Sequence, residues 1–304
     1  MTAAALDLHL QGGTTTVCRA WVLRRRDGMV LGFTDHDQPL TIDGIVCKAD
    51  TGLNARALQQ ATGLSVDNSE AVGALSDDAI CEADLSAGRF DGAEVRVWLV
   101  NWARPEERAD LFRGTLGEVL RKGAEFRAEL RGLTEPLNQV TGLAYTRTCN
   151  AVLGDGRCGF DLSLPGYFAE WEVGTLDRDQ RVLEFPGAAG FDPRWFEGGR
   201  LDVLTGQAAG LWGMIRGDRQ NGRARQIELW QSIRAPLAAG DRVRLTAGCD
   251  KRAATCRAKF ANFLNFRGFP HIPGEDWLTA YPRPGQPADG GSRTVRDLLG
   301  EIKG

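Results

Sequence analysis

The chain has 304 residues, of which 42% are apolar and 25% are charged, and its formal net charge is −3. This composition is typical of a folded globular protein of about two domains and argues against intrinsic disorder and against a general polyanion binder. The N-terminal residues show neither the basic and apolar order of a secretory signal nor an apolar run of transmembrane length.

The first part of the chain is predicted to be mostly antiparallel β structure. Residues 14–48 alternate between apolar and polar side chains, with turn signals at 26–28 and 43–44, and therefore predict a β-meander. The pattern of residues 52–75 fits either a helix or a strand. Residues 76–88, which begin with a serine, carry early acids and end in a glycine, predict a short capped helix.

Period-two alternation continues in the next part of the chain. Residues 92–102, GAEVRVWLVNW, are rich in valine and tryptophan and predict a strand. Residues 111–131 predict two or three further strands with a turn at Lys122-Gly123, and residues 133–140 predict a brief helical piece. The fold class indicated by this pattern is mainly β, that is, a β-rich α+β protein.

The region after Cys158 is also predicted to be β structure. Short segments separated by Gly, Asp, Asn and Pro turns indicate a small barrel or sandwich. The segments are residues 168–177, 181–185, 198–206, 211–218, 223–230 and 241–248. Residues 283–304 begin as a Pro/Gly linker and end in a weakly amphipathic segment, so we expect a tail that docks on a partner.

Four cysteines form two pairs in polar segments that contain glycine and arginine. Cys149 and Cys158 are separated by eight residues, and Cys249 and Cys256 by six. A total of seven cysteines, an odd number in a chain made in the cytosol, argues against a disulfide framework. Neither pair has the tight C-x2-C spacing of a zinc knuckle, and wider loops favour an iron–sulfur cluster. Zinc and uncoordinated thiols remain alternatives.

The sequence around the other three cysteines differs from that around the two pairs, and the second pair lies among basic residues. Cys18, Cys47 and Cys81 lie in strand-like or helix-like apolar patterns and are expected to pack as small hydrophobic residues. Residues 251–267 contain five cations and no acid, and such cations lower the pKa of thiols and offset the charge of a ligated cluster. These cations are Lys251, Arg252, Arg257, Lys259 and Arg267.

Two further groups of polar residues were weighed as sites. The carboxylates in Asp35-His36-Asp37 suit a divalent cation or a general base, but the segment fits better a strand end whose carboxylates cap backbone N–H groups. His271 lies near the cysteines and is a candidate ligand. Its position between two prolines favours a structural, hydrogen-bonding histidine. No catalytic residue is predicted.

Several long sequence segments resemble the baseplate hub proteins of phage-like tails found in gene transfer agents and related siphophages. These segments are LRRRDGMVLGFTDHD, DLSAGRFDGAEVRVWLVNW, ELRGL, TCNAVLGDGRC and CDKRAATCRAKFANFLNFRGFPHIPG. The two cysteine pairs also resemble those of the lambda-type tail tip protein L family, whose members carry an iron–sulfur cluster.

This resemblance implies a structural protein of a tail baseplate, made in the bacterial cytoplasm. It implies a homotrimer between a distal tail protein ring and the central tip or fibre protein, with a tail-associated cell-wall peptidase as a possible further partner. DNA would pass through the assembled channel without sequence-specific binding. Finally, the resemblance implies that one [4Fe–4S] cluster is bound by four residues, which are Cys149, Cys158, Cys249 and Cys256.

The expected domain organisation combines this resemblance with the strand pattern. A β-rich hub domain of the tail β-barrel type is followed by a cysteine-rich cluster-binding region, which is interrupted by an inserted β domain, and then by a linker and tail. The corresponding residues are 1–145, then 146–165 with 246–280, then 166–245, and finally 281–304.

Two functions of other classes remain open at this point. One is a cluster-dependent or zinc-dependent enzyme that acts on cell-wall material or in redox chemistry. The absence of convergent acid and base groups and of a cofactor fingerprint favours the hub over this enzyme. The other is a carbohydrate-binding β module, because tryptophan-rich β domains can bind sugars.

Overall fold

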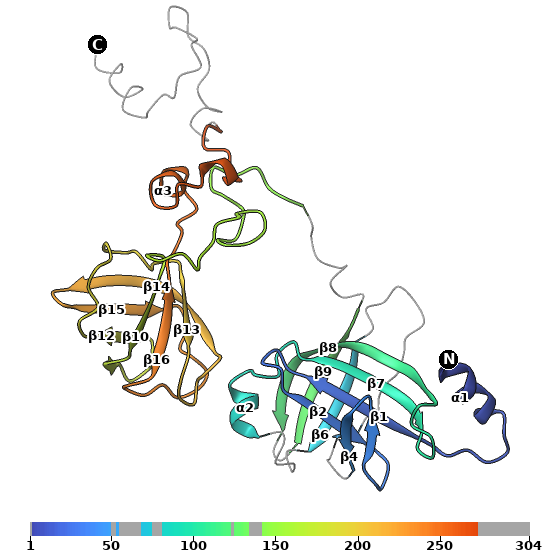
Figure 1. Cartoon of the computed structure of the whole chain (residues 1–304). Helices are drawn as coiled ribbons and strands as arrows, with labels where there is room; N and C mark the ends of the chain where they lie inside the picture. The colour runs from blue at the N-terminus through green and yellow to red at the C-terminus, as the bar shows by residue number, and fades with distance from the viewer. Residues whose placement is uncertain are drawn as a thin grey trace, which may run out of the picture.

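The computed structural model describes residues 2–49, 53–54, 68–74, 81–122, 125–133 and 142–272. Within these ranges the chain forms two β-sheets, one before and one after the first cysteine pair (Figure 1). The mainly β class expected from the alternation patterns is therefore confirmed. The predicted helical piece at 133–140, except for Leu133, and the tail from residue 283 onward lie outside the described residues.

The first sheet contains nine strands in the described residues, in the order β3-β4-β2-β1-β7-β8-β9-β6-β5. A helix, α1, precedes it and a short helix, α2, lies between its strands. Their bounds are α1 Thr2–Leu10, β1 Val17–Arg24, β2 Val30–Thr34, β3 Leu40–Ile42, β4 Ile45–Lys48, β5 Leu53–Asn54, β6 Asn68–Ala74, α2 Glu82–Ser86, β7 Glu94–Asn101, β8 Arg108–Lys122 and β9 Glu125–Gly132.

The meander predicted for the N-terminal segment is only partly correct. Strands β1 and β2 pair antiparallel, as do β3 and β4, but β4 pairs with β2 in parallel through Gly32 and Cys47. A side chain at Gly32 would lie 2.7 Å from the carbonyl oxygen of Val46, so glycine permits this close approach. Alternation specifies a strand but not its partner, which is why the sequence did not reveal the parallel pair.

Both faces of the central strands of the first sheet are buried. In β1, Trp21 and Leu23 belong to one apolar cluster, while Ala20 and Val22 belong to the cluster on the opposite face. This is the period-two arrangement of a strand. The alternation of β7 continues through the register irregularity between Val97 and Trp98, with Val97 in the first cluster and Trp98 in the second. The first sheet is thus a packed scaffold with two cores.

The cysteines outside the two pairs behave differently from one another. Cys18 and Cys47 are buried in the second of these clusters, and burial raises the pKa of both thiols to about 11, as expected of small hydrophobic residues. Cys81 is exposed, so its predicted packing is wrong. It has an extended backbone at the N-cap of α2, and the helix therefore begins at Glu82 rather than after Ser76.

The second sheet contains seven described strands in the order β10-β16-β13-β14-β15-β12-β11. All but β14, which continues past residue 218, fall within the segments predicted from the sequence. Figure 1 shows the sheet curled around one core, in which Phe185, Phe196, Leu201 and Ile227 are fully buried. The bounds are β10 Phe168–Glu172, β11 Thr175–Leu176, β12 Val182–Phe185, β13 Arg200–Val203, β14 Trp212–Asn221, β15 Ala224–Leu229 and β16 Arg242–Thr246.

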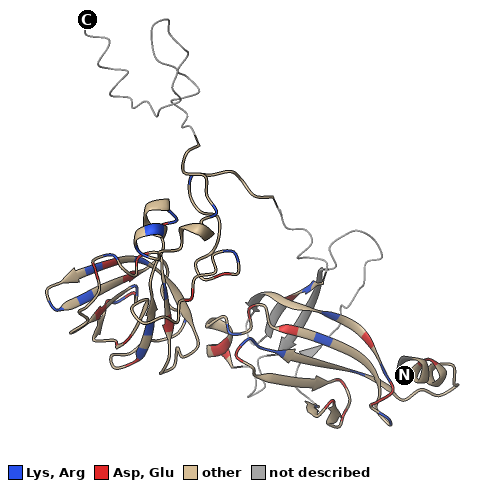
Figure 2. Ribbon diagram, turned by 45° about the horizontal axis from the view of Figure 1, so that its top comes forward, with Lys and Arg blue, Asp and Glu red and all other residues tan. Residues whose placement is uncertain are grey.

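Charged side chains are spread over both sheets, and Figure 2 shows Lys and Arg interspersed with Asp and Glu. Many form cross-strand pairs, such as Arg96 with Asp110 at 2.7 Å and Arg216 with Glu228 at 3.0 Å. This mixture agrees with the small net charge and with the exclusion of a general polyanion binder. Among the described residues, the model has no helix with the length and apolarity needed to span a membrane.

A buried arginine joins the first hairpin to α2 and makes the fold sensitive to acid. The Arg25 side chain is almost inaccessible to solvent, donates to Asp84 at 2.6 Å and also pairs with Asp27. The hydrogen bond from Arg25 holds the pKa of Asp27 below its usual value of 3.8. A depressed pKa gives stability that is fully present above the unfolded pKa of 3.8 and is lost as the pH falls through the folded value.

We therefore expect Asp27→Asn to lower the unfolding midpoint in urea at pH 7 and to have a smaller effect near pH 3. At that pH the Asp27 carboxyl of the unfolded wild type is already largely protonated. The wild type has therefore lost part of the stability that the Asp27–Arg25 pair contributes. Asp179→Asn, which changes an exposed carboxylate in the turn before β12, is the matched control and should change neither midpoint. Equal losses for Asp27→Asn at both pH values would contradict the prediction.

Candidate metal centre

The two cysteine-bearing segments, distant in sequence, are joined backbone to backbone. The amide of Cys149 donates to Lys251 O at 2.8 Å, and the amide of Phe269 donates to Thr146 O at 2.8 Å. A side chain at Gly268 would lie 2.7 Å from the Thr148 carbonyl, so glycine allows this close approach. The polypeptide itself therefore holds the two pairs together, before any metal is considered.

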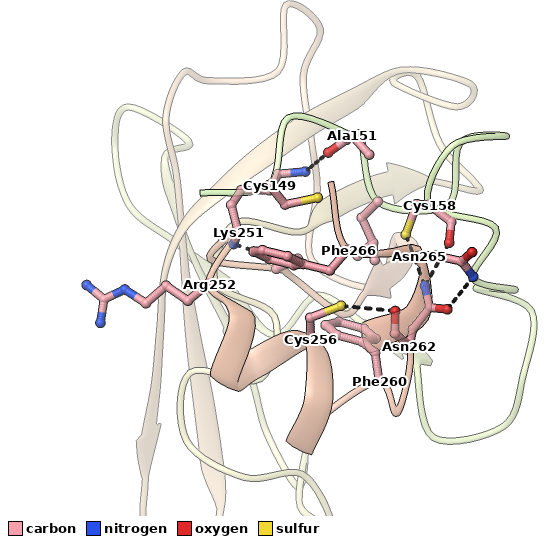
Figure 3. Close-up of a pocket in the computed structure, with 12 residues that line it drawn as sticks. Cys149, Ala151, Cys158, Lys251, Arg252, Cys256, Phe260, Asn262, Asn265 and Phe266 are labelled. Carbon is pink, nitrogen blue, oxygen red and sulfur yellow. Dashed lines mark hydrogen bonds between the residues drawn. The ribbon is translucent and has the colours of Figure 1, made fainter. Parts of the chain in front are cut away.

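All four predicted cysteines line one small pocket, with a cavity volume of about 20 Å³. Cys149 and Cys158 come from the irregular segment before β10, Cys249 follows β16, and Cys256 lies in the helix α3, Ala253–Ala258. Figure 3 shows the sulfur atoms of Cys149, Cys158 and Cys256 around the space bordered by Phe266 and Asn262. The spacing in the sequence predicted the grouping, and the structure places the four residues on one pocket wall.

Hydrogen-bond donors are directed at three of these sulfur atoms. The donor and acceptor pairs are Lys251 N with Cys249 Sγ at 3.4 Å, Arg267 N with Cys149 Sγ at 3.4 Å, and Asn262 Nδ2 with Cys158 Sγ at 3.6 Å. The fourth thiol, that of Cys256, donates to Asn262 O at 3.4 Å. N–H groups directed at sulfur stabilise thiolate ligands and tune a bound metal group.

Burial and mutual repulsion oppose deprotonation of the thiols in the pocket. Burial raises the pKa of Cys249, and it also raises the pKa of Cys256, to which repulsion from the other three thiolates adds. Four thiolates in one pocket repel one another, so a bound metal group is needed to keep them deprotonated together. No aspartate or glutamate lines the pocket.

The five cations predicted to surround the cysteines have separate roles. Lys251 and Arg252 line the pocket. The Arg257 guanidinium stacks over Phe263 at 4.3 Å. Lys259 donates to Gly248 O at 2.8 Å and lies 4.2 Å from the Trp195 ring, and burial lowers its pKa to about 8. Lys259 therefore fastens α3 to the second sheet, a role that a count of charges could not reveal.

An aromatic cluster also attaches the pocket to the second sheet. The Phe160 ring lies 4.7 Å from Tyr167 and 5.0 Å from Phe260, while the Tyr167 hydroxyl donates to Lys259 O at 2.8 Å. Aromatic pairs at such distances stabilise by about 1 kcal/mol beyond their buried area. The pocket wall is thus continuous with the second core.

The donor set, four thiols in one pocket, is chemically suited to an iron–sulfur cluster. In the part of the chain that the structure describes, no three His, Cys, Asp or Glu side chains are grouped closely enough to hold one metal ion. The four thiols nevertheless share one pocket. Soft thiolate ligands select zinc or iron–sulfur groups. An iron–sulfur cluster is the larger of the two and suits four sulfur atoms that border a common space.

The other polar residues weighed from the sequence do not join this site. Asp35 Oδ1 accepts the backbone N–H of Arg19 at 2.6 Å, which confirms the capping role over the metal-binding one. His36 bonds to Gln38 N at 3.0 Å and packs 5.1 Å from Trp102. His271 is exposed and does not line the pocket, so it is not placed as a ligand.

Several residues that shape the site were missed from the sequence. Asp155 accepts backbone N–H groups from Cys158 at 2.6 Å, Arg157 at 3.0 Å and Val152 at 2.9 Å, and the bond from Cys158 is the main reason that its pKa is lowered. The Asp-Gly turn signal at 155–156 was the available clue. Asn262 and Phe266 have no local pattern that predicts their role, because their partners are distant in the chain.

Comparison with known proteins gives three results. Residues 3–161 match a family model described as "Baseplate hub protein, N-terminal attachment domain", and residues 194–276 match one described as "Phage conserved hypothetical protein BR0599". A chain in the solved structure "Virion of native gene transfer agent (GTA) particle" is 60% identical with a TM-score of 0.88, over 95% of this chain and 99% of that one. No curated protein matches the chain.

Proposed function

The chain belongs to the baseplate hub proteins of gene transfer agents and related phage tails, and from this premise we propose that three copies form a ring at the tail end of the particle. The chain is a structural component of a virion-like tail, so the enzymatic alternative is set aside. In our proposal the ring lies between the distal tail protein and the central tip protein, and DNA passes through its channel. A cell-wall peptidase is a further proposed partner.

We propose that the domains divide as the sequence indicated. Residues 1–145 attach to the tail as a β-barrel-type hub domain, and residues 166–245 form a small β-barrel or sandwich inserted into the cysteine-rich region. The match of residues 3–161 to an attachment domain supports the first assignment. The seven-stranded sheet of the described residues, which encloses one core, supports the second.

We further propose that Cys149, Cys158, Cys249 and Cys256 bind a [4Fe–4S] cluster with a structural role. The observation that carries this proposal is that all four residues, from two distant segments, line a single pocket with N–H donors at its sulfur atoms. Such a cluster would supply iron–thiolate bonds that tie together the two ends of the segment 159–248, which contains the inserted domain.

The test is the iron and acid-labile sulfide content of protein purified without oxygen. We expect iron and sulfide in equal amounts, about four of each per chain, because this is the composition of the cluster. Zinc without sulfide would retain the cross-link but refute the cluster. Neither iron nor zinc would refute both. Native mass spectrometry of the same sample tests the trimer, and a monomer at micromolar concentration would contradict it.

A further inference from the structure

A groove of about 890 Å³ lies between the second sheet and the α2 segment of the first sheet. This volume suits a peptide or a small molecule. One wall carries Trp212, Met214 and Trp230, from β14 and the residue after β15. The other wall carries charged residues before β2 and around α2, which are Arg26, Asp27, Arg89 and Asp91.

The apolar wall is unusually exposed for side chains of this size. Trp212, Met214 and Trp230 are 54%, 44% and 61% accessible to solvent. The amide of Trp230 donates to Met214 O at 3.0 Å, so the two residues face each other across neighbouring strands, and Trp212 precedes Met214 by two residues on the same strand. Residues with these positions share one face of a sheet. The three side chains therefore form one surface.

Stacked arginines hold both tryptophan rings in place. Arg200 lies 4.9 Å over Trp212, and Arg216 lies 5.4 Å over Trp230. Arg200 in turn pairs with Asp202, and Arg216 pairs with Glu228 at 3.0 Å. A rigid aromatic surface loses little entropy when a partner binds, and tryptophan, arginine and methionine are enriched in the cores of interfaces.

The two walls are fastened to each other. Arg89 donates to Gln207 O at 2.8 Å and to Ala209 O at 3.1 Å, and Arg234 pairs with Asp91 at 2.9 Å. The groove therefore has a defined width. Figure 2 shows acidic residues on the α2 segment beside the second sheet, so the aromatic wall faces a partly acidic one.

The aromatic wall suits a proline-rich segment. Aromatic-lined grooves bind P-x-x-P sequences, whose preferred extended conformation costs little entropy to fix. The chain contains two such sequences. Pro270 and Pro273 form one, at the end of the described residues. Pro284 and Pro287 form the other, within Tyr281-Pro-Arg-Pro-Gly-Gln-Pro287, where Arg283 precedes them. Asp27 and Asp91, which line the groove, are already paired with Arg25 and Arg234, so the fit rests on the aromatic wall.

We propose that residues 281–287 of one copy bind in the Trp212–Met214–Trp230 groove of a neighbouring copy. The described residues end at Ile272, and Figure 1 shows this end beside α3 and away from α2. Nine residues from Ile272 to Tyr281 reach about 30 Å when extended, which suits an adjacent copy. The proposal rests on the proposed function, because it needs several copies in one ring.

The experiment measures binding of a synthetic peptide with the sequence of residues 279–289. The receptor is the full chain with Pro284→Ala and Pro287→Ala, which removes its own copy of the motif. We expect saturable quenching of tryptophan fluorescence, and at least tenfold weaker binding after Trp230→Ala, because a central tryptophan dominates such interfaces. Trp102→Ala, which changes an exposed tryptophan of the first sheet, is the control and should leave the affinity unchanged.

The other possible results contradict either the groove assignment or the proposed trimer. Absence of peptide binding, or equal binding after Trp230→Ala, would overturn the groove assignment even if the chain is trimeric. Binding of a chitin oligosaccharide in place of the peptide would assign the groove to glycans and also overturn it. Peptide binding by a chain that native mass spectrometry finds monomeric would support the groove and refute the trimer.

Discussion

Cys256→Ser is expected to lower the melting temperature of the iron-loaded protein by about 10 °C or more. If the four cysteines are ligands, the metal group closes the loop of residues 159–248 in the native state. The loop-entropy model assigns about 4–5 kcal/mol to a cross-link of this span, and each kcal/mol shifts the melting temperature of a protein of this size by about 2–4 °C. Differential scanning calorimetry under nitrogen measures the shift.

The same substitution separates ligation from packing. Cys256 is only 9% accessible and donates to Asn262 O, and serine retains a donor of nearly the same size. The protein stripped of metal should therefore melt within a few degrees of the stripped wild type. Cys81→Ser, at an exposed position before α2, is the matched control and should change neither form. A loaded Cys256→Ser protein that melts with the loaded wild type would refute the structural role.

Assembly provides a second readout of this variant. We expect Cys256→Ser to reduce the yield of complete particles when it replaces the wild-type hub. Without the metal cross-link the ends of the inserted domain are not held together, so the surfaces that contact neighbouring tail proteins are less well ordered. The effect should be absent for Cys81→Ser. Normal particle yield together with lost iron would show that the cluster does not serve assembly.

The strands were largely predictable from the sequence, but their partners were not. Alternation identified β7, whose two faces meet different cores, and turn-bounded short segments predicted the strands of the second sheet. The turn at 122–123 correctly separated β8 from β9. The parallel pairing of β4 with β2 depends on contacts across the fold, such as the close approach at Gly32, for which alternation carries no signal. The helix α1 was missed, although its alanine and leucine residues favour helix formation.

The grouping of the four cysteines was predictable from the sequence, but the surroundings of their pocket were not. Cysteines in polar, glycine-containing segments stood apart from Cys18 and Cys47, which lie in alternating strands. Asn262 contacts the Cys158 segment through its side chain, with Nδ2 to Cys158 O at 2.7 Å, a contact that spans the inserted domain. Lys259 counted as one more cation in the sequence, but burial among Trp195, Phe260 and two carbonyl oxygens gives it a structural role. Long-range contacts of this kind leave no local pattern.

Asp218→Ala is expected to destabilise the second sheet by about 3–5 kcal/mol, because it leaves a buried arginine without its ion-pair partner. The side chains of Asp218 and Arg225 are both 0% accessible, and Arg225 Nε donates to Asp218 Oδ1 at 2.6 Å. The other carboxylate oxygen accepts the backbone N–H of Phe196 at 2.9 Å, and Arg225 also donates to Asp192 O. The pair thus holds the segment before β13 against the core, and no other described contact satisfies the Arg225 Nε once the carboxylate is removed.

Two further variants distinguish this mechanism from a simple loss of attraction. Asp218→Leu combined with Arg225→Met removes both charges, and we expect it to be more stable than Asp218→Ala because no buried charge remains unpaired. Glu170→Ala breaks exposed pairs with Arg242 and Arg244 and should cost at most about 1 kcal/mol. Urea unfolding followed by tryptophan fluorescence gives all three values. A double variant less stable than Asp218→Ala would contradict this mechanism. It would show that the attraction between Asp218 and Arg225 stabilises the fold, and that the unpaired charge of Arg225 is not the cause of the lost stability.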